Sequence, residues 1–190
     1  MINITIITLF LCFFDKLLEY FNIYGRYYFN HFLINSFIVY YTFDDLLLCY
    51  HDLNNLNKYH INMNVIEYTI SIHFYHIIIY YNQFVFDDWL HHIVMIFFTL
   101  PMGVYLNCGP IMSHCLFFMS GFPGGLNYLL LFLQRNNLIK KKLQKRINYH
   151  LNLWIRNPGC IASSLLSYLY YIYFIKNDII SSLFTYYIII

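Results

Sequence analysis

The sequence carries little charge. Only 11% of its 190 residues are Asp, Glu, Lys or Arg, whereas soluble domains carry roughly 25%. With 9 acidic and 11 basic side chains, the chain cannot cover a water-exposed surface, which argues against a soluble enzyme, a disordered protein or a nucleic-acid-binding protein. The net charge of +2 is also too small to indicate a polyanionic partner. Because 60% of the residues are hydrophobic and the mean hydropathy is +0.52, we expect a membrane protein.

Several chemical motifs are absent as well. The five cysteines are dispersed and form no CxxC pair, which argues against a disulfide framework or a zinc site. Glycine and proline are scarce, and there is no P-loop, GxGxxG or GxSxG. One HH and one HxxH occur, but the HxxHH spacing of membrane di-iron hydroxylases and desaturases does not. We therefore expect neither a metal nor a bound cofactor.

Long apolar segments dominate the chain instead. Measured against the roughly 20 residues that cross a hydrocarbon core, they predict an all-α polytopic transmembrane bundle of about six or seven spans around a central cavity. The expected spans are residues 2–14, 27–43, 65–86, 90–108, 111–133 and 160–175, followed by a short apolar tail at 179–190, with a polar loop at 50–64. This divides the chain into an N-terminal apolar segment (1–26), a transmembrane domain (27–175) and an apolar C-terminal tail (176–190).

The basic residues predict the orientation of these spans. Seven of the 11 lie between Arg135 and Arg156, so we expect residues 134–156 to form a cytosolic loop. Alternating the spans from there places Lys16 and Arg26 on the cytosolic side too, and only Lys58 and Lys176 on the far side. The ordinary role of such a juxtamembrane basic stretch is to hold topology and attract anionic lipid. The alternative is that it binds a phosphate-bearing substrate such as a CoA ester.

The segment from Phe86 to Met95 carries the strongest chemical pattern. If a helix begins there, Asp87 and Asp88 occupy its first turn, where carboxylates are stabilised by the helix dipole. Four residues separate Asp87 from His91 and Asp88 from His92, so each pair can meet on one face. A carboxylate that fixes an imidazole tautomer produces a general base, and these four residues are the predicted catalytic group. The alternative is an interfacial helix start with half-wetted histidines.

Further polar residues are candidates for lipid binding. Thr69, His73, His76 and Tyr80 recur at helical spacing, so they form a stripe that lines a cavity or joins helices by hydrogen bonds. His114, in the fifth span, has no acidic neighbour and is a further candidate.

A glycine-rich break lies near the middle of the fifth span. Within residues 120–128, Pro123, Gly124 and Gly125 predict a kinked or unwound helix. The break serves either a bound lipid or close helix packing.

A multi-pass chain with an acidic residue just before His91 and His92 resembles the TLC-domain membrane proteins, which include the ceramide synthases. The resemblance implies a ring of about six helices around a lipid-sized cavity and a location in the endoplasmic reticulum. It makes His91 or His92 the base, with Asp87 or Asp88 beside it, and acyl-CoA a co-substrate. Ceramide synthases carry a later acidic pair, but here no Asp or Glu lies between Asp88 and Asp178. Two functions therefore stay open: acyl transfer to a membrane lipid, and non-catalytic lipid binding or regulation of membrane composition.

Overall fold

The computed structural model describes residues 2–175, and all regular secondary structure in this range is helical, as predicted. The predictions for the tail at 179–190 and for Lys176 lie outside the described residues. The α-helices are α1 (Ile2–Tyr20), α2 (Arg26–His51), α3 (Met63–Tyr80), α4 (Phe86–Ile93), α5 (Leu100–Tyr105), α6 (Pro110–Leu116), α7 (Phe122–Arg135), α8 (Lys141–Leu151) and α9 (Asn157–Tyr170). Short 3₁₀ turns follow α2 (η1, Leu53–Lys58) and α3 (η2, Tyr81–Gln83). Four π-helical turns complete the set: η3 (Val94–Thr99), η4 (Phe117–Gly121), η5 (Asn152–Arg156) and η6 (Tyr171–Ile175).

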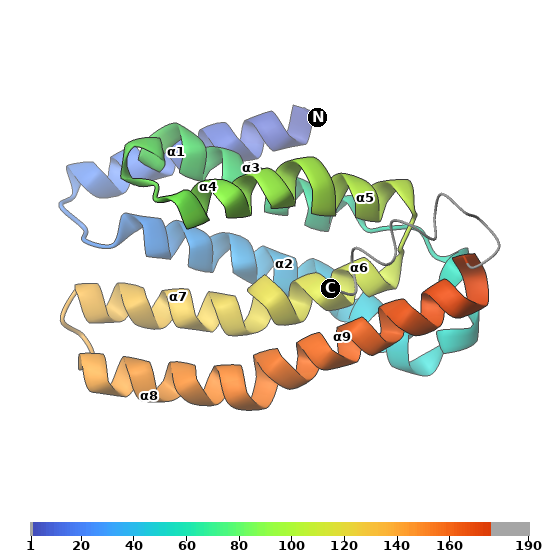
Figure 1. The fold of residues 1–190 in the computed structure, drawn as a ribbon. Coiled ribbons are helices and arrows are strands. Elements are labelled where there is room, and N and C mark those ends of the chain that lie inside the picture. Colours follow the sequence, from blue (N-terminus) through green and yellow to red (C-terminus); the bar gives the residue numbers. More distant parts are fainter. Residues whose placement is uncertain (1, 176–190) are drawn as a thin grey trace.

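The π-helical turns join neighbouring α-helices into longer rods. Residues 86–105, 110–135 and 141–175 are each continuous helix, so the chain runs up and down through the bundle (Figure 1). The connections 21–25, 81–85 and 136–140 meet at one end, which we call the α1–α2 end. The connections 52–62 and 106–109 lie at the other, the α2–α3 end.

Helix α2 lies at the centre of the bundle. It packs against α1, α3, α6 and α7, while α8 packs on α7 and α9 on α6. Two helices, Arg26–His51 and Pro110–Arg135, are long and apolar enough to cross a membrane, which by itself is weak support for a membrane location.

Helix α1 belongs to the same bundle. Its Leu11 is fully buried, the Ser71 hydroxyl of α3 donates to the Ile4 carbonyl oxygen (3.2 Å), and the Thr8 hydroxyl donates to the Ser71 carbonyl oxygen (3.5 Å). The turn after α1 depends on Gly25, whose φ of 72° is left-handed and favours glycine. That turn delivers Arg26 to the start of α2.

The prediction of a loop at 134–156 was wrong. Only residues 136–140 connect α7 to α8, and the rest of the basic stretch is helical. Lys, Leu, Gln and Arg are strong helix formers, and the stretch is amphipathic. Leu151 and Gln144 are buried, the Gln144 amide donates to the Asn127 side-chain oxygen of α7 (3.1 Å), and the lysines stay exposed.

The break predicted around Gly121 takes a mild form. The chain makes the π-helical turn η4 and then continues as α7, with Pro123 in its first turn, where no backbone donor is needed. The ends of the predicted spans also differ from the ends of the helices. Helix α2 continues through Asp44 and Asp45 to His51, and the Asp45 carboxylate finds a partner inside the bundle, since it accepts a hydrogen bond from the Ser113 hydroxyl of α6.

Candidate functional site

Five histidines from three helices gather near the α1–α2 end. His31 comes from α2, His73 and His76 from α3, and His91 and His92 from α4. The short connection 81–85 makes α3 and α4 antiparallel neighbours, so their histidine turns face each other. Ring centroids lie 5.1 Å apart for His73 and His91, 4.8 Å for His76 and His92, and 5.7 Å for His31 and His76. We call these five residues the histidine cluster.

Two hydrogen bonds link the cluster in pairs. Nδ1 of His73 bonds the Thr69 carbonyl oxygen (2.7 Å), and since a carbonyl only accepts, the proton of His73 sits on Nδ1. Its Nε2 therefore accepts from Nε2–H of His91 at 3.3 Å. In the second pair, Nε2 of His92 lies 2.8 Å from Nδ1 of His76, so one proton is shared between two rings.

Parts of the histidine cluster have no hydrogen-bond partner in residues 2–175. Nδ1 of His92 and Nε2 of His31 are both buried and unpaired. Such atoms cost about 1–3 kcal/mol each when they stay unsatisfied, so a native structure keeps them for a reason. His31 was missed by the sequence reasoning because it has no acidic or histidine neighbour at helical spacing. Its ring stacks on Tyr128 of α7 at 4.4 Å, a contact that no local pattern reveals.

The predicted start of a helix at Phe86 is confirmed, and Asp87 and Asp88 lie in the first turn of α4. The expected aspartate–histidine pairs do not form in the part of the chain that the structure describes. The Asp88 carboxylate accepts from the Val85 backbone N–H (3.0 Å), so it caps the helix, while both histidines bond to histidines of α3. Adjacent helical residues point about 100° apart, and accordingly His92 faces inward, 3% exposed, while His91 is exposed.

A cavity of about 640 Å³ opens at the α1–α2 end beside the histidine cluster. This volume falls within the range of small-molecule sites. The wall is aromatic and polar, and it comprises Ile23, Tyr24, Gly25, Arg26, Tyr27, Tyr28, His76, Tyr80, Gln83, Phe84, Asp88 and Arg135. His76 is the one member of the histidine cluster in this wall, so it connects the cavity to the buried rings behind it.

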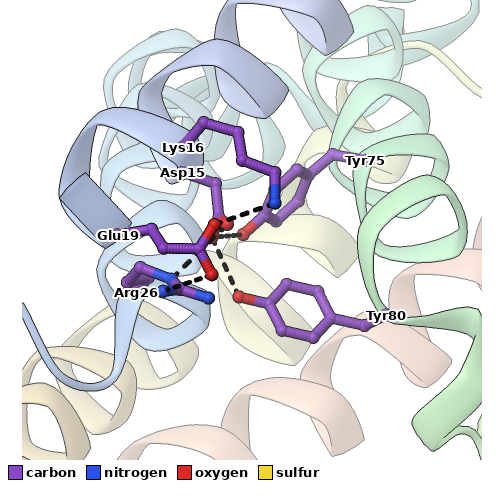
Figure 2. A network of polar contacts seen from close by, with 6 residues as sticks. All are labelled: Asp15, Lys16, Glu19, Arg26, Tyr75 and Tyr80. Carbon is purple, nitrogen blue, oxygen red and sulfur yellow. Dashed lines mark hydrogen bonds and ion pairs between the residues drawn. The ribbon is translucent and has the colours of Figure 1, made fainter. Parts of the chain in front are cut away.

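A second polar network adjoins the cavity, because Arg26 and Tyr80 belong both to the network (Figure 2) and to the cavity wall. Asp15 of α1 is fully buried, and its Oδ1 accepts hydrogen bonds from the hydroxyls of Tyr75 and Tyr80, each at 2.8 Å. Nε of Arg26 lies 3.5 Å from the other carboxylate oxygen, and Nη1 of Arg26 lies 3.1 Å from Glu19. The charge of Arg26 is thus matched by two carboxylates.

This network positions one side of the cavity. Tyr80 is fixed at its hydroxyl by Asp15, and its ring contacts those of His76 (5.9 Å) and Tyr27 (5.4 Å). Sequence reasoning missed Asp15 and Arg26. The available signal was an acidic residue directly after an apolar segment, whose partner had to be sought elsewhere in the fold.

His114 lies away from the cluster. It sits on α6 beside the C-terminal end of α2, where the Tyr50 hydroxyl donates to its Nε2 (2.8 Å) and its Nδ1 donates to the Ser163 hydroxyl oxygen (2.7 Å). On α2, His31 and Tyr50 are 19 residues apart, about 28 Å along the axis. Both nitrogens of His114 are satisfied, which is the arrangement of a structural core histidine.

Pro123, Gly124 and Gly125 are buried where α7 meets neighbouring helices. A Cβ added to Gly125 would lie 3.1 Å from Cβ of Asn35 on α2, and one added to Gly124 would lie 3.6 Å from Nη2 of Arg156. Close helix packing, one of the two roles that the sequence left open, therefore describes their surroundings. The lipid-binding role of these three residues stays a prediction.

No group of three or more His, Cys, Asp or Glu side chains within residues 2–175 is arranged to hold a metal ion. Comparison with protein-family models, curated proteins and solved structures found no match.

Proposed function

We propose that this chain is an integral membrane protein. More of its helices lie in the bilayer than Arg26–His51 and Pro110–Arg135, the two that are long and apolar enough to cross a membrane. Large apolar side chains on other helices point outward: Phe13 of α1 is 67% exposed, Phe97 of η3 68% and Ile161 of α9 71%. In water such faces promote association, whereas lipid chains cover them without cost. The TLC-like bundle and the endoplasmic reticulum location implied by the resemblance are part of this proposal.

Within that setting, the site fits acyl transfer to a membrane lipid. The main support for this proposal is the 2.8 Å hydrogen bond between His76, which lines the cavity, and His92, which is buried behind it. A second imidazole bonded to the first fixes its tautomer and shares the proton that the first one takes up, and this is what a general base requires.

In this reaction His76 acts first as a general base and then as a general acid. A hydroxyl or amine of the acceptor lipid gives its proton to His76 as its oxygen or nitrogen attacks the carbonyl carbon of an acyl thioester such as acyl-CoA. The new ester or amide bond forms, the C–S bond breaks, and the leaving thiolate takes the proton back from the imidazolium. His92 orients the His76 ring, and the Asp15–Tyr80 contact holds the adjoining wall. The base thus differs from the sequence expectation, since a histidine of α3 faces the cavity.

Non-catalytic lipid binding is the second candidate. Its support is that both histidine pairs also join α3 to α4, so they hold the bundle together whether or not a reaction takes place. In this case the protein binds a lipid in the cavity, or influences membrane composition, without catalysing a reaction.

Lipid mass spectrometry separates the two functions. Membranes from cells that express the wild type are compared with membranes containing His76→Ala, His92→Ala or His76→Gln at matched protein level. His150→Ala is the control, because His150 is an exposed histidine on α8 outside the cavity. Acyl transfer predicts a lipid class that rises with the wild type and the control and not with the other variants. Identical profiles, together with a lipid that co-purifies equally with all the proteins, would refute catalysis.

A further inference from the structure

The cavity wall contains four charged or readily charged groups besides its tyrosines, and only some of them are free for a ligand. Arg26 is held by Asp15 and Glu19, and His76 is bonded to His92. Arg135 and Asp88 remain. Within residues 2–175 neither forms an ion pair, so the cavity presents one cation and one carboxylate that are not paired with an opposite charge.

Arg135 is prepared to bind an anion. Its guanidinium lies over the ring of Tyr28, 5.8 Å from the centroid, which restricts its orientation. The connection that follows is fixed as well, because the Asn136 amide donates to the Tyr24 carbonyl oxygen (2.9 Å). A planar guanidinium held in this way suits the paired oxygens of a phosphate.

Asp88 is prepared to bind a cation on the same wall. One of its carboxylate oxygens caps α4 through the Val85 N–H, and this bond fixes the carboxylate while the other oxygen forms no hydrogen bond among the described residues. A protonated amine provides three donors and a charge, and it matches such a carboxylate.

The location indicates a lipid head group as the source of both charges. Aromatic and basic side chains gather at this end of the bundle, among them Trp89 (39% exposed), Tyr24 (72% exposed) and the exposed Lys141 and Lys142. Aromatic belts and basic clusters mark the membrane–water interface, which is the depth of the head groups.

We propose that the cavity binds a phospholipid head group that carries both a phosphate and a primary ammonium, with the phosphate at Arg135 and the ammonium at Asp88. This rests on the proposed membrane-lipid site and specifies its ligand. A ligand with a phosphate alone satisfies Arg135 and leaves Asp88 facing an anion, so the pair discriminates by electrostatic complementarity.

The test uses the full chain, purified in detergent and mixed with equal amounts of phosphatidylethanolamine and phosphatidylglycerol, with retained lipid counted by native mass spectrometry. We expect about five-fold more phosphatidylethanolamine than phosphatidylglycerol on the wild type, the upper end of what an exposed ion pair contributes. Asp88→Asn should retain both lipids without preference, because asparagine still accepts from the Val85 N–H. Arg135→Gln should retain about five-fold less of both.

Two matched control variants test whether the effect depends on the position of the charges in the cavity. Asp87→Asn and Lys142→Gln remove the same charges from exposed side chains that do not line the cavity, and we expect the wild-type preference from both. Equal retention of the two lipids by the wild type, or an unchanged preference in Asp88→Asn, would overturn the proposal. Displacement of bound lipid by micromolar soluble phosphoethanolamine would overturn the assignment to a lipid.

The outcome can be separated from that of acyl transfer. His76→Ala leaves Arg135 and Asp88 in place, so lipid preference is measured without turnover. A His76-dependent lipid product without head-group preference would refute only head-group recognition by Arg135 and Asp88. Preference without such a product would refute only the proposed transfer.

Discussion

The buried carboxylate of Asp15 provides the sharpest test of how the bundle is held together. Replacing it with alanine removes the carboxylate oxygen that accepts from the hydroxyls of the fully buried Tyr75 and of Tyr80, and removes one of the two carboxylates that neutralise Arg26. Breaking a buried charged pair costs about 3–5 kcal/mol. Because the Arg26 side chain is 26% exposed and keeps Glu19, we expect the lower end, about 3 kcal/mol.

Two further variants divide this value among its parts. Tyr75→Phe removes one donor while Asp15 keeps Tyr80 and Arg26, so we expect a loss of about 1–1.5 kcal/mol. Glu19→Gln affects the exposed ion pairs of Glu19 with Lys16 and Arg26, so its cost should be well below that of Asp15→Ala.

Reversible unfolding in mixed micelles, followed by tryptophan fluorescence and far-ultraviolet circular dichroism, measures these differences in the free energy of unfolding. The reasoning would be refuted by an Asp15→Ala variant within 0.5 kcal/mol of the wild type. It would also be refuted if Glu19→Gln were as damaging as Asp15→Ala, since burial would then not decide the cost.

Other predictions address helix packing, His114 and the effect of pH. Gly159→Ala places a methyl group against the ring of Phe118, where there is no room for it, so stability should fall by about 1–3 kcal/mol in the same assay and recover in part with Phe118→Leu; an unchanged midpoint contradicts this. His114→Phe removes the N–H that donates to the buried Ser163 hydroxyl, while Tyr50, 58% exposed, loses an acceptor that solvent can replace, so the substitution should cost about 1 kcal/mol. Head-group preference should persist because the site is at the other end of the bundle; loss of preference counts against the placement. Hydrogen bonds from Tyr59 and Asn55 lower the pKa of the Asp52 carboxyl in the folded protein. These bonds therefore stabilise the folded state fully at pH values above the ordinary aspartate pKa, and the stabilisation is lost as the pH falls through the lowered pKa. Tyr59→Phe should therefore shift the unfolding midpoint at pH 7 and less at pH 2.5, and an equal shift at both would refute this.

Some features followed from the sequence alone because they depend on local spacing. Helical structure throughout residues 2–175 follows from long apolar segments and strong helix formers, and the start of α4 follows from Asp87 and Asp88 at the head of an apolar run. The opposite exposure of His91 and His92 follows from the 100° step of the helix.

Local spacing was insufficient where a segment's environment decided its structure. Residues 141–156 look like a basic loop by charge, but burial of Gln144 and Leu151 against α7 favours a helix whose charged side remains exposed. Around Gly121, a π-helical turn absorbs the irregularity because the helix continues to pack along α2. Charge and glycine content describe what a segment tolerates, while packing selects among the tolerated forms.

The partners of each polar side chain were decided only by the tertiary structure. The sequence places Asp88 and His92 on one helical face, yet the aspartate bonds the Val85 backbone and the histidine bonds His76 on another helix. Likewise Asp15 meets Tyr75, 60 residues away in the chain, because α1 packs against α3. Composition and helical period are properties of each segment. The pairing of buried polar groups is set by which helices become neighbours, since each must find a partner wherever the packed bundle offers one.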